Sequence, residues 1–497
     1  MSDPTPGVGR KIALGAATMI AGRFAIRGLS VVSTLILARL LTPQDFGLVA
    51  LAAAAFVVAD MLTATNYGLV LVRRAHVDRD LYDTAWTMNL LRCSLLGGLV
   101  AATAHWQAEL LNEPRVAPVL MVIGLNVALD GLFSIGFARL QREFRFGPGV
   151  RHQVVGRVVA FVLTVVFAVM WETYWALVLG NLTAKLFTIP YSYWLAPHRP
   201  RLRLTHAREL LGFSKWALAL NACQIADGQG PNLVIGRFIG LHALGMQTSA
   251  YQIAATPVTE LAVPIRAPIY SGYASALHDQ GLLRRQYLDG LALLATVIVP
   301  LSVGIALVAP EVERVALGPQ WVGAWVFIVF CALYALLDAL SHFAHPLFTV
   351  QDRMARLVGL YAALMAIRVP AIILAAFGWG ALGVLVAMAA TAVLNFVVWQ
   401  WAAGRLLGHG LGAALLRVWR PFVAAAVMAA AVLALRPHLA PADSSLLDAL
   451  RLLGQLAPAG AAVHVAAALL LWRIAGAPAG PEQQILSFLG RARPQPA

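Results

Sequence analysis

Residues 35–51 read LILARLLTPQDFGLVAL, and residues 233–249 read LVIGRFIGLHALGMQTS. In both stretches an arginine is followed eight residues later by a glycine, and the two copies are 198 residues apart. Apolar helices resemble one another by chance, but an arginine–glycine element repeated at one separation argues for an internal repeat. The paired positions are Leu35 with Leu233, Arg39 with Arg237 and Gly47 with Gly245.

The repeat extends beyond this element. The region around Asp130 matches the region around Asp338 at a separation of 208 residues. An even number of predicted spans separates the copies, so the copies run parallel rather than inverted. Two such six-helix bundles facing each other across a central cleft are typical of an alternating-access transporter.

The composition places the chain in a membrane. Of its 497 residues 60% are hydrophobic and 12% are charged, and the mean hydropathy is +0.75. Soluble globular chains carry roughly 25% charged residues, so this chain has too little polar surface to face water. The composition excludes a soluble exported enzyme, a disordered chain and a nucleic-acid-binding domain. The net charge of +14 is interpreted as the basic excess found beside membrane spans.

Fourteen stretches are apolar over the roughly 20 residues that a membrane-crossing helix needs. Basic residues between them number 25 on one side and 6 on the other, which predicts that both termini are cytoplasmic. The 25 include Arg157, which also lies near the start of the predicted fifth span. The predicted spans are 18–40, 46–71, 84–105, 116–139, 155–171, 173–195, 213–237, 244–269, 287–309, 322–347, 356–377, 379–403, 419–436 and 456–474.

The predicted fold is an all-α polytopic membrane protein with two six-helix lobes and two additional C-terminal helices. The predicted outer loops are short and contain no extramembrane domain. The expected segments are an N-terminal lobe at 1–197, a basic cytoplasmic linker at 198–212, a C-terminal lobe at 213–405, two further spans within 406–480 and a cytoplasmic tail at 481–497.

Two arginines in the first span are candidates for binding an anion. Arg23 and Arg27 lie on one helix face with Ser30 and Thr34, because the steps are four, three and four residues. Charge at membrane depth costs about 2.5–3.5 kcal/mol per residue, and guanidinium groups bind phosphate bidentately. The alternative is that both arginines extend to the cytoplasmic headgroups.

Spans seven and eight carry amides and a further arginine at membrane depth. Gln224 and Asn232 lie in a stretch that also holds glycines and a proline. Gln252 and Arg266 lie on a span that three prolines kink or break. These side chains are predicted to line a substrate-binding cavity with the arginines of the first span. The alternative is hydrogen bonding between helices.

Carboxylates at membrane depth are candidates for coupling transport to an ion gradient. Asp60, Asp227 and Glu260 are the predicted coupling residues, because a carboxylate in a low dielectric exchanges a proton near neutral pH. Asp60 and Glu260 occupy near-equivalent positions in the two copies. The alternative is that a buried carboxylate pairs with a buried cation; Asp130 and Asp338 are further such carboxylates, and Arg92, Lys185 and Arg368 are the cations.

The sequence contains no nucleotide-binding glycine-rich loop followed by Lys and Ser or Thr. Its three cysteines have no spacing that indicates a metal site or a disulfide framework. Neither a cofactor nor a metal is therefore expected. A proton or sodium gradient is the expected source of energy.

Several motifs resemble the polysaccharide flippase family of the Wzx type, within the multidrug/oligosaccharidyl-lipid/polysaccharide exporter superfamily. The likeness runs from about residue 15 to 435, in matching order over both halves. The motifs are LARLLTPQDFGLVAL at 37–51, LQREFRF at 140–146, LLGFSKWAL at 210–218, LVIGRFIGLHALGMQTSAY at 233–251 and LGPQWVGA at 317–324.

This resemblance implies a fourteen-helix, two-lobed fold in the bacterial inner membrane. It implies an ion-coupled flippase with a cationic cavity, which moves an undecaprenyl-pyrophosphate-linked oligosaccharide to the outer leaflet for polymers such as lipopolysaccharide or exopolysaccharide. By resemblance Arg266 falls on the usual arginine of span eight, and Arg23 and Arg27 on the cations of span one in related flippases. The stretch 227–240, DGQGPNLVIGRFIG, departs from the family by a Gly-Pro insert.

Other functions compete with this one. An ion-coupled exporter of drugs or small cations is the alternative within the superfamily, and its cavity should be acidic or aromatic. A membrane glycosyltransferase or polymerase would need carboxylates on an outer loop, or a sizeable outer domain, to hold acceptor and donor. A non-catalytic scaffold would leave the buried charges unexplained. The expected partners are a lipid-linked oligosaccharide, membrane lipids, and a polysaccharide polymerase and glycosyltransferases, without nucleic acid.

Overall fold

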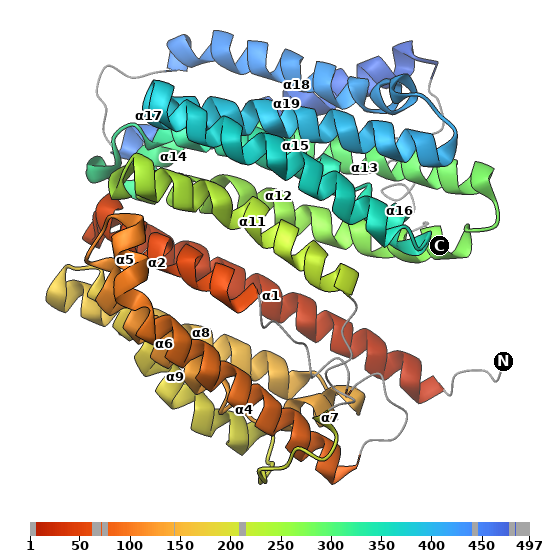
Figure 1. The fold of residues 1–497 in the computed structure, drawn as a ribbon. Coiled ribbons are helices and arrows are strands. Elements are labelled where there is room, and N and C mark those ends of the chain that lie inside the picture. Colours follow the sequence, from red (N-terminus) through yellow and green to blue (C-terminus); the bar gives the residue numbers. More distant parts are fainter. Residues whose placement is uncertain are drawn as a thin grey trace, which may run out of the picture. The chain divides into compact units, whose positions relative to one another are not determined.

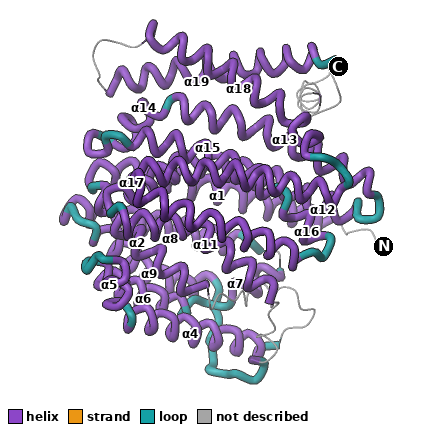
Figure 2. Tube along the Cα trace, turned by 45° about the horizontal axis from the view of Figure 1, so that its top comes forward, coloured by secondary structure: helices purple, strands orange, loops and turns teal. Residues whose placement is uncertain are grey.

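The computed structural model describes residues 6–61, 71, 78–143, 145–207, 215–439, 446–476 and 483. Over these residues the chain consists of helices joined by short loops and contains no strand (Figure 2). The prediction of an all-α membrane protein is confirmed. The reason is that a bilayer offers backbone polar groups no water, so each span must satisfy its own hydrogen bonds.

The chain forms two compact units, Met1–Gly245 and Met246–Ala497, and each is described by itself. The predicted lobes at 1–197 and 213–405, with the linker, additional spans and tail between and after them, stay a prediction.

The first unit is a bundle in which α8 packs between α1 and α9, α6 packs on α4, α9 and α2, and α11 packs on α2 (Figure 1). Its short helices α5 and α7 connect the long ones. The bounds are α1 Pro6–Leu40, α2 Pro43–Met61, α4 Arg79–Ala102, α5 Ala104–Leu111, α6 Val116–Asp130, α7 Gly136–Arg142, α8 Gly147–Trp171, α9 Trp175–Leu195, α11 Lys215–Phe238 and the first turn of α12 Leu241–Ser275.

In the second unit α13 packs against α15 and α18, α15 packs on α17, and α18 packs on α19 (Figure 1). A short irregular segment, residues 309–321, joins α13 to α15. The bounds are α13 Gln280–Leu307, α14 Ala309–Val312, α15 Ala324–His342, α16 His345–Val350, α17 Met354–Leu407, α18 Leu411–Leu439 and α19 Leu446–Ile474.

Nine helices in the described part of the chain are long and apolar enough to cross a membrane. One of them, α17, has 54 residues, a length of about 80 Å at 1.5 Å per residue, whereas a hydrocarbon core is about 30 Å thick. It contains a break at Gly380, with φ 59° and ψ −141°, a conformation that suits glycine. The break falls at the start of the predicted span 379–403, next to the predicted boundary with the span 356–377, so the structure is consistent with fourteen spans.

A single carboxylate fixes the beginnings of two helices in the first unit. The Asp45 carboxylate accepts hydrogen bonds from the Thr42 backbone N–H at 3.0 Å and from the Thr42 hydroxyl at 2.6 Å, at the start of α2. Its other oxygen accepts from the Tyr174 backbone N–H at 3.1 Å, at the start of α9. Helix N-termini carry unsatisfied N–H groups and favour negative charge. Asp45 therefore ties the α1–α2 turn to the α8–α9 turn.

The repeated glycines of the sequence contact each other. A Cβ atom on Gly47 would lie 1.9 Å from the Leu241 carbonyl oxygen, and a Cβ atom on Gly245 would lie 1.7 Å from the Pro43 carbonyl oxygen. Pro43 and Leu241 are themselves 198 residues apart, so the contact is reciprocal. Each glycine lets the backbone of one helix touch the backbone of the other. The two copies of the repeated element thus form the contact between α2 and the first turn of α12.

Gly47→Ala should separate these backbones and destabilise the protein by about 1–3 kcal/mol, the usual cost of overpacking. Gly98→Ala on α4 is the matched control, because a Cβ atom there meets nothing within 4 Å. Thermal unfolding in detergent should show a lower midpoint for the first variant only. Equal midpoints would show that the α2–α12 contact can yield without cost.

Candidate functional site

A polar cavity of about 380 Å³ lies within the first unit, between α1, α8 and α9. It is the strongest candidate site because polar and cationic side chains converge there from helices that are otherwise apolar. Its lining residues are Ile26, His152, Gln153, Gly156, Arg157, Ala160, Asn181, Ala184, Lys185 and Thr188.

Small residues bring the helices of this cavity close together. A Cβ atom on Gly22 of α1 would lie 2.2 Å from a methyl carbon of Val150 on α8, and one on Gly156 of α8 would lie 3.0 Å from the Thr188 methyl on α9. Close approach through small residues is the usual way in which membrane helices pack. The polar side chains of α8 therefore face α1 and α9 at short range.

Arg157 is the cation of this cavity that lacks a counterion. Its Nε atom is buried and has no hydrogen-bond partner, and within the described parts of the chain no carboxylate pairs with its guanidinium. The charge that acts on it is a like charge, from Arg27 on α1. Two guanidinium groups that repel each other in a low dielectric are stabilised when an anion lies between them.

The sequence-based count grouped Arg157 with the basic residues of the cytoplasmic side, although the predicted span at 155–171 contains it. Helix α8 begins at Gly147, with a proline in its first turn, which is eight residues before the predicted span at 155–171. Arg157 thus lies well inside the helix, and its side chain lines the cavity. The sequence signal for this position was that Arg157 lies between two pairs of valines, Val154–Val155 and Val158–Val159, as expected within an apolar helix.

Lys185 is neutralised within the same cavity. Its Nζ atom lies 2.6 Å from an Asp130 carboxylate oxygen on α6 and donates to the Asn126 carbonyl at 3.2 Å. This is the ion-pair alternative that the sequence left open for Asp130. Because the pair cancels its own charge, the net positive charge of the lining comes from Arg157.

His152 forms an aromatic side of the cavity. Its Nε2 atom lies 3.1 Å from the Thr188 carbonyl oxygen. Its ring packs edge-on against Phe133 at 5.0 Å and stacks on Tyr191 at 5.9 Å. Histidine and aromatic faces beside the amides Gln153 and Asn181 are groups that can contact a sugar ring.

The predicted coupling residue Asp60 has a partner in the structure. The guanidinium of Arg92 on α4 donates to the Asp60 carboxylate on α2 at 2.8 Å. The ion-pair alternative thus holds for Asp60 as well. A role in ion coupling is compatible with such a pair, because transfer of a proton to Asp60 would release Arg92, and this role stays a prediction.

The predicted residues of span seven lie on α11, in the first unit. Gln224 is exposed, Asp227 is buried, and Asn232 is half-buried and donates to the Gln229 side chain at 3.0 Å. Arg23 and Arg27 are exposed on α1. Of these predicted binding residues, Arg27 is linked to the polar cavity, because its charge acts on Arg157.

The predicted residues of span eight lie on α12, in the second unit. Gln252 is exposed and Glu260 is half-buried. Arg266 also lies on α12, and its side chain is outside the described residues. Their roles in binding and coupling stay predictions.

A second polar network lies inside the second unit, around Asp338 of α15. Its carboxylate lies 3.1 Å from His342 Nδ1 and accepts from the Tyr334 hydroxyl at 3.4 Å. That hydroxyl accepts from Arg368 of α17 at 3.0 Å, and His342 Nε2 lies 2.5 Å from the Tyr361 hydroxyl. The carboxylate and the arginine therefore share one internal network, connected through a tyrosine.

The second unit also contains an apolar groove of about 420 Å³. Helices α12, α13, α18 and α19 line it, and the lining consists of aliphatic, methionine, proline and glycine residues. A groove of this kind can hold a hydrocarbon chain.

An all-helical fold with apolar spans and a cationic polar cavity inside one bundle defines a polytopic membrane transport protein. The comparisons with known proteins agree. The chain belongs to the family described as "Polysaccharide biosynthesis protein", whose model matches residues 36–326. The family resemblance seen in the sequence is confirmed, and the chain falls among transport proteins rather than enzymes.

Three curated relatives are similar over much of the chain. The succinoglycan biosynthesis transport protein ExoT of Rhizobium meliloti is 23% identical, over 62% of this chain and 62% of its own length. The lipopolysaccharide biosynthesis protein WzxC of Escherichia coli is 21% identical, over 80% and 82%. The teichuronic acid biosynthesis protein TuaB of Bacillus subtilis is 22% identical, over 85% and 88%.

Two solved structures share the fold. The lipid II flippase MurJ in an inward closed conformation superposes with a TM-score of 0.65 at 11% identity, covering 91% of this chain and 98% of that chain. An inward-facing multidrug resistance transporter of the MATE family gives a TM-score of 0.55 at 16% identity, covering 77% and 94%. At these identities the likeness shows the fold alone.

Lys185→Met should leave the Asp130 carboxylate unpaired and destabilise the protein by about 2–3 kcal/mol, the cost of a charge at membrane depth. Adding Asp130→Asn removes that charge and should recover most of the loss. Thermal unfolding midpoints of the two variants in detergent measure the difference. A single variant as stable as the double variant would contradict the pairing.

Proposed function

We propose that this protein flips an undecaprenyl-pyrophosphate-linked oligosaccharide across the bacterial cytoplasmic membrane by alternating access, for export of a cell-surface polysaccharide. The observation that carries the proposal is Arg157, a cation with a buried unpartnered Nε atom that faces a polar cavity beside Arg27.

The electrostatics of this cavity favour a compact, multiply charged anion. Arg27 and Arg157 repel each other, and an anion between them converts that repulsion into two attractions. Guanidinium groups form paired hydrogen bonds to phosphate oxygens. A pyrophosphate offers several such oxygens in one small group, which matches two arginines better than a single carboxylate does.

The remaining lining suits the sugar part of such a substrate. Gln153 and Asn181 can donate to and accept from hydroxyl groups, and His152 adds a ring face next to Tyr191. The names of the relatives, which refer to succinoglycan transport and to lipopolysaccharide and teichuronic acid biosynthesis, support a polysaccharide precursor as the cargo.

The energy for transport is proposed to come from a proton or sodium gradient, through Asp60, Asp227 and Glu260. The Asp60–Arg92 pair supplies a physical route, because neutralising the carboxylate leaves a half-buried arginine without its counterion. Gln224, Asn232, Gln252, Arg23 and Arg266 are proposed to contact the substrate during the cycle. Both termini are proposed to be cytoplasmic, where glycosyltransferases supply the substrate; a polymerase would receive it outside.

Flipping of a labelled undecaprenyl-pyrophosphate oligosaccharide in proteoliposomes tests the proposal. Arg157→Gln and Arg27→Gln should each slow flipping about tenfold to a hundredfold, because each removes charge-assisted hydrogen bonds worth about 1.5–3 kcal/mol. Arg157→Lys should retain part of the activity, since the charge stays while the paired geometry is lost. Arg266→Gln tests the arginine that the family resemblance implies.

Arg151→Gln is the matched control, because Arg151 lies on the same helix but interacts with the Trp194 ring at 5.5 Å instead of lining the cavity. It should flip at the wild-type rate. No transport of any lipid-linked glycan by the wild type, with efflux of cationic dyes, would instead assign the protein to the drug-exporter branch.

A further inference from the structure

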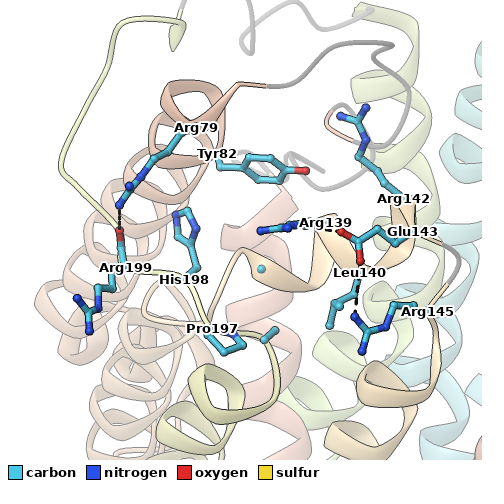
Figure 3. Close-up of a pocket in the computed structure, with 12 residues that line it drawn as sticks. Arg79, Tyr82, Arg139, Leu140, Arg142, Glu143, Arg145, Pro197, His198 and Arg199 are labelled. Carbon is cyan, nitrogen blue, oxygen red and sulfur yellow. Dashed lines mark hydrogen bonds and ion pairs between the residues drawn. The ribbon is translucent and has the colours of Figure 1, made fainter.

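A second cavity, of about 710 Å³, opens at one end of the first unit. The beginning of α4, the short helix α7 with the residues after it, and the segment that follows α9 form its walls (Figure 3). The count of basic residues assigns this end to the cytoplasm. The cavity is separate from the polar cavity between α1, α8 and α9, with which it shares no lining residue.

Arginines stand on opposite sides of this cavity. Arg79 and Arg199 lie on one side, and Arg142 and Arg145 lie on the other, with Arg139 between them (Figure 3). Glu143 is the one carboxylate among the lining residues, and it lies 3.1 Å from Arg139 and 3.7 Å from Arg145. Arg79 lies 3.9 Å from the Asp83 carboxylate behind the lining. The lining therefore carries a large excess of positive charge.

Arg199 is available to a ligand. Its backbone carbonyl accepts a hydrogen bond from Arg79 at 3.4 Å, while its own guanidinium has no partner among the residues that the structure describes. Among the residues that the structure describes, the Arg145 guanidinium pairs with the Glu143 carboxylate alone, at 3.7 Å, and its side chain is 64% exposed. Each side of the cavity thus presents a guanidinium group that has few interactions with the protein.

The wall after α9 is fixed rather than loose. The Asp83 side chain is fully buried, lies 2.9 Å from His198 Nε2, and accepts from the Arg201 backbone N–H at 3.3 Å. The Ser134 hydroxyl donates to the Ala196 carbonyl at 2.6 Å. A preorganised wall lowers the entropy cost of binding a ligand.

The segment that continues from this wall carries exposed leucines. Leu202 is 74% exposed and Leu204 is 52% exposed, whereas Arg203 between them turns back to pair with Asp80. The Arg203 backbone N–H also donates to the Thr87 hydroxyl at 3.1 Å, which holds the segment against α4. Apolar side chains presented beside arginines are typical of a surface that rests in the headgroup region of a bilayer.

An exposed tryptophan lies next to the cavity wall along the chain. Trp194, in the last turn of α9, is 66% exposed and lies under the Arg151 guanidinium. Tryptophan is enriched at the boundary between hydrocarbon and headgroups. The cavity wall begins two residues later, at Ala196, so the cavity lies at the depth of lipid phosphates.

We infer that this cavity is a binding site for the phosphate-bearing headgroup of a membrane lipid, with a headgroup of two phosphates spanning its two basic sides. The site does not depend on which substrate the protein transports. Phosphate is the anion that guanidinium groups match, and the exposed leucines favour a lipid over a soluble anion. The bound lipid would neutralise the arginines that otherwise repel one another across the cavity.

Native mass spectrometry of the full-length protein in detergent, with added tetraoleoyl diphosphatidylglycerol, tests the site. Arg145→Gln combined with Arg199→Gln removes one guanidinium group from each side and should weaken lipid binding about tenfold, the effect of losing roughly 1.4 kcal/mol. Arg284→Gln combined with Arg285→Gln removes the same charge from exposed positions on α13. This control should bind the lipid as the wild type does.

Further probes identify the source of the phosphate. Undecaprenyl pyrophosphate that displaces diphosphatidylglycerol from the wild type but not from the Arg145/Arg199 variant would support the site and show that it also takes the lipid carrier. Equal weakening in both double variants would overturn the inference, because charge alone would then explain binding. Displacement by inorganic pyrophosphate at the same concentration as by lipid would overturn the lipid assignment.

Discussion

The contact between Gly47 and Gly245 is the constraint on which the first unit depends. Each glycine lies against the backbone of the opposite helix, at Leu241 and at Pro43, so a side chain on either would force the helices apart. Glycine destabilises a helix relative to other residues. This contact explains why glycine nevertheless occurs at both positions. The same contact places α11 and the first turn of α12 with α2 in one compact unit. The internal repeat is therefore a structural device, in which two copies of one element bind each other.

Charge inside the apolar helices is handled in two ways, and the difference between them locates the site. The pairs Asp60–Arg92 and Asp130–Lys185 neutralise themselves at 2.8 Å and 2.6 Å. Arg157 lacks such a pair and is repelled by Arg27. A cation that remains unsatisfied in a low dielectric is expensive, so its retention points to an anion that visits. The fold alone, shared with a lipid II flippase and a multidrug transporter, does not make this distinction.

The two basic cavities of the first unit differ in their surroundings and therefore in what they can select. Arg157, in the polar cavity between α1, α8 and α9, is partly buried among apolar helices. Electrostatic interactions are strong there, and an incorrect ligand leaves polar groups unpaired. The arginines of the second cavity, beside α4 and α7, are largely exposed, and salt screens their charge. This suits binding of an abundant lipid rather than discrimination among glycans. The sequence predicted a basic cytoplasmic linker, and in the structure its hydrogen bonds to Asp83 and Thr87 hold it against α4 as part of the wall of a cavity.

The sequence by itself determined the membrane setting, the helical class, the repeated arginine–glycine element and the positions of most spans, because hydropathy and helix length are properties of consecutive residues. It also singled out Arg27 and listed the cations that turned out to pair with Asp60 and Asp130. Only the tertiary structure decided which partner each carboxylate takes, that Arg157 faces a cavity, and that α17 breaks at Gly380. These depend on which helix faces meet, and residues that meet across helices are far apart along the chain. The polarity of a residue can be read locally, but whether its charge is satisfied is decided by its neighbours in space.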